Sequence, residues 1–191
     1  MLLNRERANI IMDKYNLDAL LAREHINIHY LTDYWDTQAD GRWPYLVYAL
    51  LPRELNNEPS LILPSVKLER LSIWPTWVKN ILPYSDYSGR EHSLGFKSES
   101  DEPIASQWNG WPIRQGVKLT DLEKKWINLS KKYKEQMSAT STWGLFRAIK
   151  ESNLQNKRIG SDDPRVLEWI KGMGLSGIEP IDATNIFREI R

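Results

Sequence analysis

The chain contains no cysteine, which excludes disulfide bonds, thiolate catalysis and cysteine-based zinc sites. It also has only three histidines and three phenylalanines among its 191 residues. No apolar run approaches the roughly 18 residues of a membrane-spanning helix. The N-terminus turns charged after two leucines, without the apolar segment of a signal peptide. We therefore expect a cytoplasmic protein with no membrane partner.

An excess of charge of one sign is missing as well. Lys and Arg total 26 against 25 Asp and Glu, a formal net charge of +1. This balance argues against a broad electrostatic surface for nucleic acid or anionic lipid. Hydrophobic residues make up 41% of the chain and charged residues 27%, as in ordinary soluble proteins. A chain of this length can fold as one domain without a metal or disulfide to hold it.

Tryptophan, by contrast, is abundant, with nine copies. Three of them fall inside helical patterns and are expected to be structural: Trp126, Trp143 and Trp169. The other six lie in or near predicted loops, beside Pro, Gly or Asp: Trp35, Trp43, Trp74, Trp77, Trp108 and Trp111. Core packing accounts for many tryptophans in proteins, but these six are also candidates for contact with a ligand or partner.

The stretch from residue 17 to residue 51 has the most informative pattern. Two apolar, strand-like segments, Leu17–Ala22 and Tyr45–Leu51, flank a polar connection. Within ten residues this connection places Tyr34, Trp35, Asp36, Asp40, Arg42 and Trp43. Surface loops are usually built from Gly, Pro, Ser and Asn. Aromatic rings with a guanidinium group instead indicate a surface that receives a ligand or another subunit.

Hydrophobic periodicity predicts alternating strands and helices. Apolar residues at i, i+3, i+4 and i+7 indicate a helix from about Ala8 to Tyr15, with Asn16 as a left-handed C-cap. Strands are predicted at 17–22, 45–51, 60–63, 78–84, 157–161 and 178–181. Helices are predicted at 65–74 with Ser65 as a candidate N-cap, and at 120–133, 138–150, 163–172 and 184–191, while 24–32 is a turn or short helix. The alternation predicts an α/β domain, and a hairpin between the second and third strands makes its sheet mixed.

Motifs for catalysis are mostly absent. The sequence has no nucleophile elbow, P-loop or dinucleotide-binding glycine turn. His25 and His29 are spaced i, i+4 but lack the glutamate of a zinc-protease helix, so a half-exposed pair is the favoured interpretation. Asp162 and Asp163 follow a strand, where carboxylates can bind metal, but Asp163 precedes Pro164 and better suits a helix N-cap. The chain alone does not look like a complete enzyme.

The segment LDALLAREHINIHYLTDYW resembles the opening of the creatinase, prolidase and aminopeptidase P family. The likeness rests on Asp18–Leu21, on Asn27-Ile28, and on Tyr30-Leu31-Thr32 followed by Asp33 where the family usually has Gly. The far end resembles the family's domain junction at Arg158–Gly160, Ile181-Asp182 and Phe187–Arg191. Residues 87–118 have no clear counterpart. Each motif is short, and their order and spacing carry the resemblance.

The resemblance implies a three-layer α/β/α fold with a mixed sheet of about five to six strands, ribonuclease H-like. Residues 1–183 would form the N-terminal domain, with a polar excursion at about 85–118. Residues 184–191 would start a linker helix to a C-terminal "pita-bread" catalytic domain outside this chain. No cofactor is then expected here. A divalent metal (Mn, Co or Zn) would belong to that domain, whose two Asp, one His and two Glu ligands should follow Arg191 in the reading frame.

The resemblance also implies a homodimer whose N-terminal domains contribute substrate contacts to the partner's active site, but no catalytic residue. Asp40-Gly41-Arg42 resembles the Phe-Gly-Arg of creatinase, so Arg42 is a candidate clamp for a substrate carboxylate. Asp40 replaces the aromatic residue, which argues against creatine itself. The remaining candidates are Trp35, Trp43 and Trp74, the last resembling an active-site tryptophan of aminopeptidase P. The alternatives are a solvent-exposed or structurally paired Arg42 and tryptophans that pack within the domain.

Three functions remain open at this stage. The first is the accessory domain of an Xaa-Pro dipeptidase, an aminopeptidase or a creatinase-like amidinohydrolase. The second is a free-standing module of the same fold that binds a small zwitterion or carboxylate. The third is a nuclease, because the fold is ribonuclease H-like, although the balanced charge and the missing carboxylate cluster argue against it.

Overall fold

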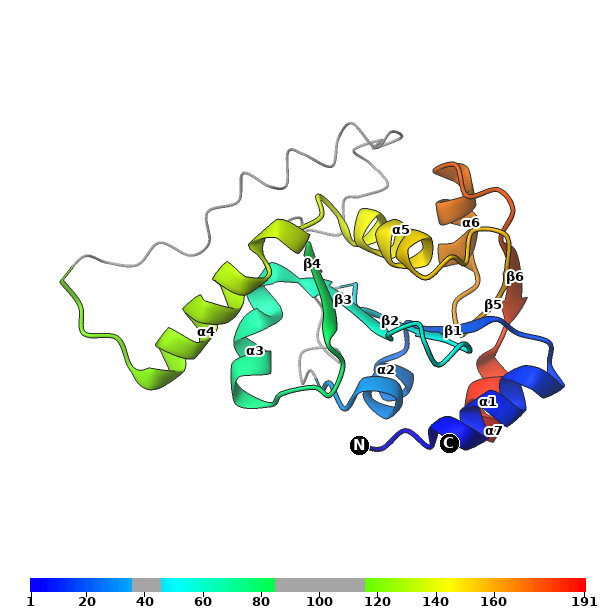
Figure 1. Cartoon of the computed structure of the whole chain (residues 1–191), viewed down its shortest axis with the longest axis horizontal. Coiled ribbons are helices and arrows are strands. Elements are labelled where there is room, and N and C mark those ends of the chain that lie inside the picture. The colour runs from blue at the N-terminus through cyan, green and yellow to red at the C-terminus, as the bar shows by residue number, and fades with distance from the viewer. Residues whose placement is uncertain (36–45, 85–115) are drawn as a thin grey trace.

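A computed structural model of the chain describes residues 1–35, 46–84 and 116–191. Its centre is a six-stranded sheet in the order β4-β3-β2-β1-β5-β6 (Figure 1). The strands are β1 (Ala19–Ala22), β2 (Tyr48–Pro52), β3 (Ser60–Pro64), β4 (Asn80–Tyr84), β5 (Arg158–Ser161) and β6 (Glu179–Asp182). β2 runs antiparallel to both β1 and β3, and the other neighbouring pairs are parallel. The predicted mixed sheet with a β2–β3 hairpin is confirmed.

Helices cover both faces of this sheet. They are α1 (Arg5–Lys14), α2 (His25–Thr32), α3 (Leu68–Ile73), α4 (Asp121–Lys132), α5 (Ser141–Glu151), α6 (Arg165–Gly172) and α7 (Thr184–Ile190). One apolar core joins α1, α2, α3 and α7 to the sheet, and a second joins α5 and α6 to its other face (Figure 1). The predicted three-layer α/β/α architecture is therefore confirmed.

The central strands are buried on both faces, as their unbroken apolar sequences predict. In β1, Leu20 belongs to the core under α1, while Leu21 belongs to the core under α5. β2 alternates in the same way, with Leu51 in the first core and Leu50 in the second. Successive side chains point to opposite faces, so each strand contributes to both cores.

Helix ends agree with the sequence in some places and differ in others. Asn16 is left-handed with φ 52°, and Thr120 with Glu123 forms the predicted capping box of α4. Ser65 is not an N-cap: it begins a single 3₁₀ turn, η1 (Ser65–Lys67), that leads into α3, and neither element has a side-chain cap. Ser65 lies inside the 3₁₀ turn, so Pro64, which has no polar side chain, takes the flanking position from which an N-cap side chain would accept an amide N–H.

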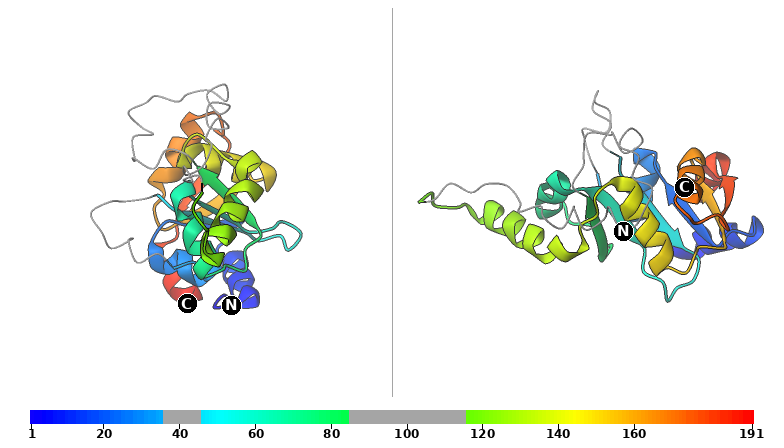
Figure 2. Two further views of the ribbon diagram at one scale, coloured as in Figure 1. Left: turned by 90° about the vertical axis from the view of Figure 1, so that its left-hand side faces the viewer. Right: turned by 90° about the horizontal axis from the view of Figure 1, so that it is seen from above.

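The helix α4 has no fully buried residue and extends away from the sheet beyond β4 (Figure 2). Trp126 and Leu129 on its apolar side pack against the α1-side core, and Tyr133 just after the helix is buried. Trp143 in α5 is fully buried, and Trp169 in α6 packs against the core of its own face. The structural role predicted for the three helical tryptophans is confirmed.

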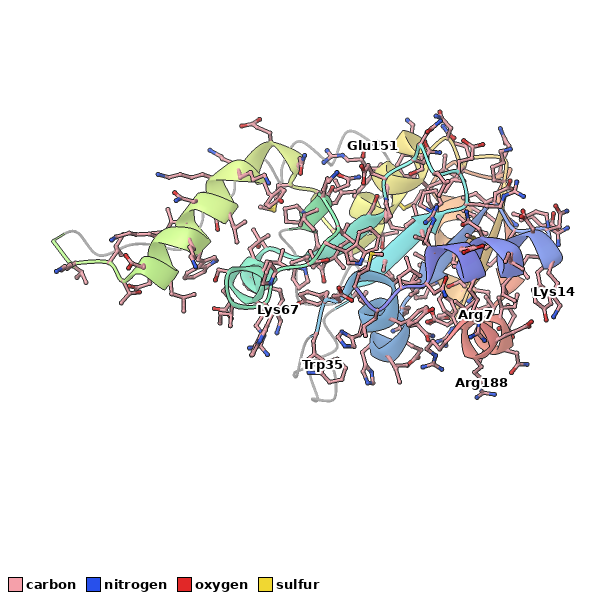
Figure 3. The ribbon with its side chains drawn as sticks, turned by 60° about the horizontal axis from the view of Figure 1, so that its bottom comes forward. Arg7, Lys14, Trp35, Lys67, Glu151 and Arg188 are labelled. Atoms are coloured by element: carbon pink, nitrogen blue, oxygen red, sulfur yellow. The ribbon has the colours of Figure 1, made fainter. Side chains whose placement is uncertain are left out.

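The first and last helices lie beside each other, so the two termini are close in space (Figure 1). Glu189 of α7 accepts hydrogen bonds from Lys14 at 2.7 Å and from the hydroxyl of Tyr15 at 2.9 Å. Figure 3 shows Arg7, Lys14 and Arg188 on this outer surface. Within the described ranges, every helix is too short or too polar to cross a lipid bilayer.

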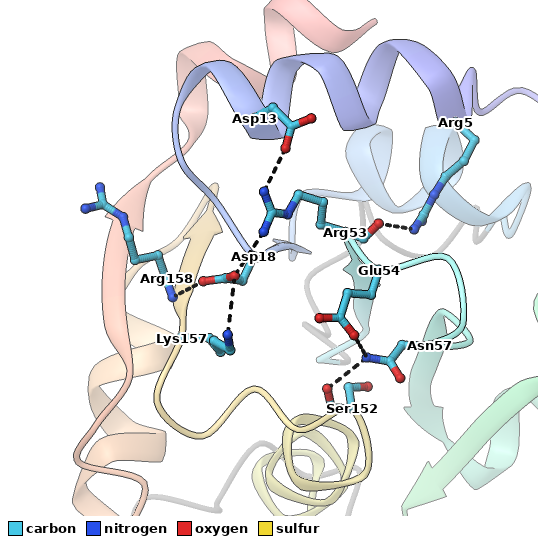
Figure 4. Close-up of polar contacts among 9 residues, drawn as sticks. All are labelled: Arg5, Asp13, Asp18, Arg53, Glu54, Asn57, Ser152, Lys157 and Arg158. Carbon is cyan, nitrogen blue, oxygen red and sulfur yellow. Dashed lines mark hydrogen bonds and ion pairs between the residues drawn. The ribbon is translucent and has the colours of Figure 1, made fainter.

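A polar network closes the end of the sheet where β1 and β5 begin (Figure 4). Asp18 accepts the backbone N–H of Arg158 at 3.0 Å and lies 3.8 Å from the ammonium of Lys157. Arg53, just after β2, bridges Asp18 at 3.4 Å and Asp13 of α1 at 2.7 Å. These contacts fix α1 and the β2–β3 turn to the start of the parallel strand pair.

Candidate functional site

Trp35 lies just after α2, and its ring contacts two histidines of that helix. Its ring centroid is 5.8 Å from that of His25 and 5.0 Å from that of His29, both edge-to-face. Two residues earlier, Asp33 is left-handed with φ 59° and ends the helix, and Trp35 follows that turn. The indole remains 37% exposed, which is enough to contact a ligand or partner (Figure 3).

Trp74 lies at the end of α3, on the same side of the sheet. The guanidinium of Arg70 is 4.7 Å from the centroid of its ring, a cation–π contact worth roughly 0.5–1 kcal/mol at an exposed site. The Trp74 side chain is 51% exposed, and neighbouring Ile73 is exposed as well. Arg70 and α3 therefore hold one face of the ring while the rest stays accessible to solvent.

The chain segments that carry these two tryptophans lie next to each other. The hydroxyl of Thr76, two residues after Trp74, donates to the backbone carbonyl of Thr32 at the end of α2 and accepts the N–H of Val78 at 3.1 Å. Among the described residues, the two indole rings do not stack on each other. We call the exposed side chains Ile26, Trp35, Ile73 and Trp74 the aromatic surface.

The other predicted substrate contacts, Asp40, Arg42 and Trp43, lie outside the described residues, and so do Trp108, Trp111 and His92. Their proposed roles remain predictions. Residues 36–45 begin directly after Trp35, and on their other side the carbonyl of Leu46 accepts the Tyr84 hydroxyl at 2.9 Å. Trp77 packs against the core and is only partly exposed, so packing is its main role.

The acidic pair after β5 has a structural arrangement. The Asp162 carboxylate accepts the backbone N–H groups of Arg23 at 2.8 Å and Glu24 at 3.0 Å, and the side-chain amide of Asn27 at 2.8 Å. Burial raises the pKa of Asp162, although its hydrogen bond from Asn27 and those from the two backbone amides act in the opposite direction. Asp162 thus binds the two residues that lead into α2 and the Asn27 side chain in its first turn.

Asp163 forms ion pairs with two arginines. Arg165 donates to its carboxylate at 2.7 and 2.9 Å, and Arg23 lies 3.0 Å away. The hydrogen bonds from Arg165 are the main reason that the pKa of Asp163 is lowered. The predicted N-cap role is wrong, because α6 starts at Arg165 and Pro164 takes the N-cap position without a side-chain cap. The Asp163 carboxylate binds the two arginines and does not cap α6.

The described residues contain no group of three or more His, Asp or Glu side chains placed to hold a metal ion. His25 and His29 face the Trp35 ring instead, a role that sequence reasoning missed. The available signal was the spacing, since two histidines one turn apart precede a tryptophan just beyond the helix end. The capping of α2 by Asp162 was also missed, because the two lie far apart in sequence.

No protein-family model and no curated protein sequence matches the chain. Solved structures do match in fold. A proline dipeptidase from Streptococcus pneumoniae aligns with a TM-score of 0.56 at 12% identity, over 99% of this chain and 97% of that one. A dipeptidase from Pyrococcus horikoshii aligns with a TM-score of 0.53 at 13% identity, over 100% of this chain and 36% of that one.

These likenesses establish a shared fold. The chain has the α/β fold found in these dipeptidases, and the resemblance read from the sequence is confirmed at that level. The chain spans about a third of the Pyrococcus dipeptidase and nearly all of the pneumococcal chain.

Proposed function

We propose that this chain is the non-catalytic N-terminal domain of a hydrolase of the creatinase, prolidase and aminopeptidase P family. In this proposal it forms a homodimer and contributes substrate contacts to the active site of the partner subunit. The observation that carries the proposal is the fold that it shares with two dipeptidases, one of which is much longer than this chain. The metal, Mn, Co or Zn, would be bound by the catalytic domain.

The aromatic surface supports a role in substrate contact. Trp35 and Trp74 expose 37% and 51% of their surface on the side of the sheet covered by α2 and α3. Large rings that are held by neighbouring side chains lose little entropy when they bind. Arg42 lies a few residues beyond Trp35 in sequence, and a guanidinium suits the carboxylate of an Xaa-Pro dipeptide. Trp43 and Asp40 complete the proposed contact set.

The isolated chain tests the non-catalytic and dimeric parts. We expect no hydrolysis of the dipeptide Ala-Pro, with or without Mn²⁺, and a dimer by light scattering across micromolar concentrations. Hydrolysis by the purified chain that is absent from a mock purification without the chain would contradict the non-catalytic role. A monomer at all concentrations would contradict the proposed dimer.

Contribution to the partner's site is tested in the form that carries the catalytic domain. Arg42→Ala and Trp35→Ala should each raise KM for Ala-Pro and leave kcat nearly unchanged, because both contacts exist before the transition state. Arg188→Ala, an exposed arginine of α7, is the matched control and should change neither. A heterodimer that pairs an Arg42→Ala subunit with a catalytically inactive subunit should have normal KM. A raised KM there would place Arg42 in its own subunit's site.

The alternative function is a free-standing small-molecule binding module of the same fold. It is favoured by the way this chain alone holds the aromatic surface, with Trp35 on His25 and His29 and Trp74 beside Arg70. Calorimetry with Ala-Pro and with creatine separates the two proposals. Direct binding by the isolated chain that is lost in Arg42→Ala but kept in Arg188→Ala supports the module.

A further inference from the structure

Asp162 connects the end of β5 to the start of α2. Its two carboxylate oxygens accept three N–H donors at 2.8–3.0 Å, all from residues 23–27. Two of these donors are the backbone N–H groups of Glu24, the N-cap of α2, and of Arg23 just before it, and the third is the side-chain amide of Asn27 in the first turn. Asp162 is 138 residues from Glu24 in sequence, so it is a tertiary contact that fixes where α2 begins.

The helix α2 has little else to define its start. Glu24 occupies the N-cap position but makes no side-chain cap, and the first turn contains no acidic residue. A carboxylate at this end is favourable because the helix N-terminus carries a partial positive charge. The neighbouring Asp163 pairs with Arg23 and Arg165, which leaves the capping of α2 to Asp162.

The same helix holds the exposed ring of Trp35. His25 is the first residue of α2 and His29 lies one turn later, and both imidazoles contact the indole. Ile28 and Leu31 are buried in the core, so the side of α2 facing the sheet is fixed by packing. The first turn, which bears His25, lies next to the Asp162 hydrogen bonds. A displacement of the first turn would therefore move His25, whose ring directly contacts Trp35.

We propose that Asp162 is a positioning residue, which sets the orientation of Trp35 by capping the helix that carries His25 and His29. The proposal rests on the proposed function only for the consequence that a misplaced Trp35 weakens substrate contact. The geometric part concerns the folded chain alone and can be tested without any substrate.

Asp18 provides a matched control at the opposite end of the same strand pair. Its carboxylate also accepts a backbone N–H across β1 and β5, from Arg158 at 3.0 Å. It also pairs with Arg53 and Lys157, and none of these three polar contacts involves α2 (Figure 4). Asp18→Asn therefore weakens the contacts at the start of β1 and β5 without removing the α2 cap.

The test uses the intact chain labelled with 5-fluorotryptophan, in which the Trp35 resonance is assigned from Trp35→Phe. In Asp162→Ala, amide exchange at Arg23 and Glu24 should accelerate about tenfold or more, as expected for loss of a charged hydrogen-bond acceptor. The Trp35 resonance should shift or broaden. Asp162→Asn, which keeps one acceptor oxygen, should lie between Asp162→Ala and the unmodified chain. Asp18→Asn should leave both readouts unchanged.

Two results would overturn the proposal. One is an unchanged Trp35 resonance in Asp162→Ala despite faster exchange at the start of α2, which would make Asp162 a purely structural cap. The other is an equal Trp35 change in Asp18→Asn, which would make the effect one of global stability. A Trp35 response specific to Asp162 supports positioning even where Ala-Pro is not bound, so failure of the proposed function is seen separately.

Discussion

At the scale of single residues, Asp33 occupies a backbone conformation that favours glycine. It has φ 59° and ψ 2°, a left-handed conformation that glycine adopts without strain. An aspartate tolerates this region better than most residues, and here its carboxylate also accepts the N–H of Leu2 at 2.7 Å and lies 3.2 Å from the N-terminal ammonium. Asp33 thus ties the start of the chain to the end of α2.

Substitutions at Asp33 separate the backbone cost from the side-chain contacts. Asp33→Gly loses the contacts and removes the strain, so we expect its free energy of unfolding to stay within about 1 kcal/mol of the unmodified chain. Asp33→Ala loses the contacts and keeps the strain, so it should be about 1–2 kcal/mol less stable than Asp33→Gly. Urea denaturation measures both. Equal stability of the two variants would contradict the role of the left-handed backbone.

A second prediction at this scale concerns Asp163 and pH. Hydrogen bonds from Arg165 lower the pKa of Asp163 in the folded chain, so its ionised carboxylate stabilises the fold at any pH above the ordinary carboxyl pKa. This contribution is lost as the pH falls from the ordinary pKa through the lowered pKa. Asp163→Asn should lower the free energy of unfolding by about 1–2 kcal/mol at pH 7, with a smaller deficit near pH 3.

Asp162→Asn is the internal comparison for that titration. Burial raises the pKa of Asp162, so ionising this group opposes folding as pH rises between the ordinary and the raised pKa. The stability deficit of Asp162→Asn should therefore shrink from acid to neutral pH, opposite to that of Asp163→Asn. Parallel pH dependence of the two deficits in urea denaturation would contradict the assigned directions.

At the scale of elements, α5 approaches the sheet closely through a glycine. A Cβ atom built on Gly144 would lie 2.9 Å from Cγ2 of Ile62 in β3, too close for a normal contact. Helix interiors ordinarily favour Ala over Gly, but the close packing of α5 on β3 reverses that preference here. The glycine is therefore needed for helix–sheet packing.

Gly144→Ala should lower the free energy of unfolding by about 1–3 kcal/mol, because the added methyl group forces Ile62 or the helix to move. Combining it with Ile62→Ala should give a smaller loss than the sum of the two single changes, since the methyl then fills vacated space. Gly172→Ala in α6, where nothing lies within 4 Å of the added atom, is the control and should be neutral or stabilising. Additive losses would contradict the contact.

The sequence predicted most elements because their signals are local. The apolar runs of β1 and β2, the left-handed Asn16 and the Thr120–Glu123 capping box each depend on a few adjacent residues. The role of Asp163 was mispredicted because its carboxylate binds Arg165 two residues later and also Arg23 from another segment, a pairing that the Asp-Pro pattern does not reveal. Trp35 and Trp74 were named from their positions in or near predicted loops and, for Trp74, from the resemblance, whereas their support by His25, His29 and Arg70 became visible only in the fold.

At the scale of the whole molecule, the two chain ends form one packed unit. Phe187 and Ile190 of α7 are fully buried in the same core as Met12 of α1. The hydroxyl of Tyr30 in α2 donates to the carbonyl of Ile190 at 3.0 Å. Under the proposed function, a catalytic domain that follows α7 would be attached to a rigid part of this domain, on the side of the sheet that carries the aromatic surface.

Phe187→Ala tests whether α7 belongs to the cooperative core. Removing a fully buried ring should lower the free energy of unfolding by about 3–5 kcal/mol. If α7 belongs to the cooperative core, the variant should still unfold in a single transition in which α7, β1 and α2 unfold together. Arg188→Ala, at an exposed position of the same helix, should change stability by less than about 0.5 kcal/mol. Hydrogen exchange would show α7 opening together with the core strands. If α7 instead exchanged early while the rest stayed protected, it would be a loosely docked tail, and a rigid attachment of any following domain would be untenable.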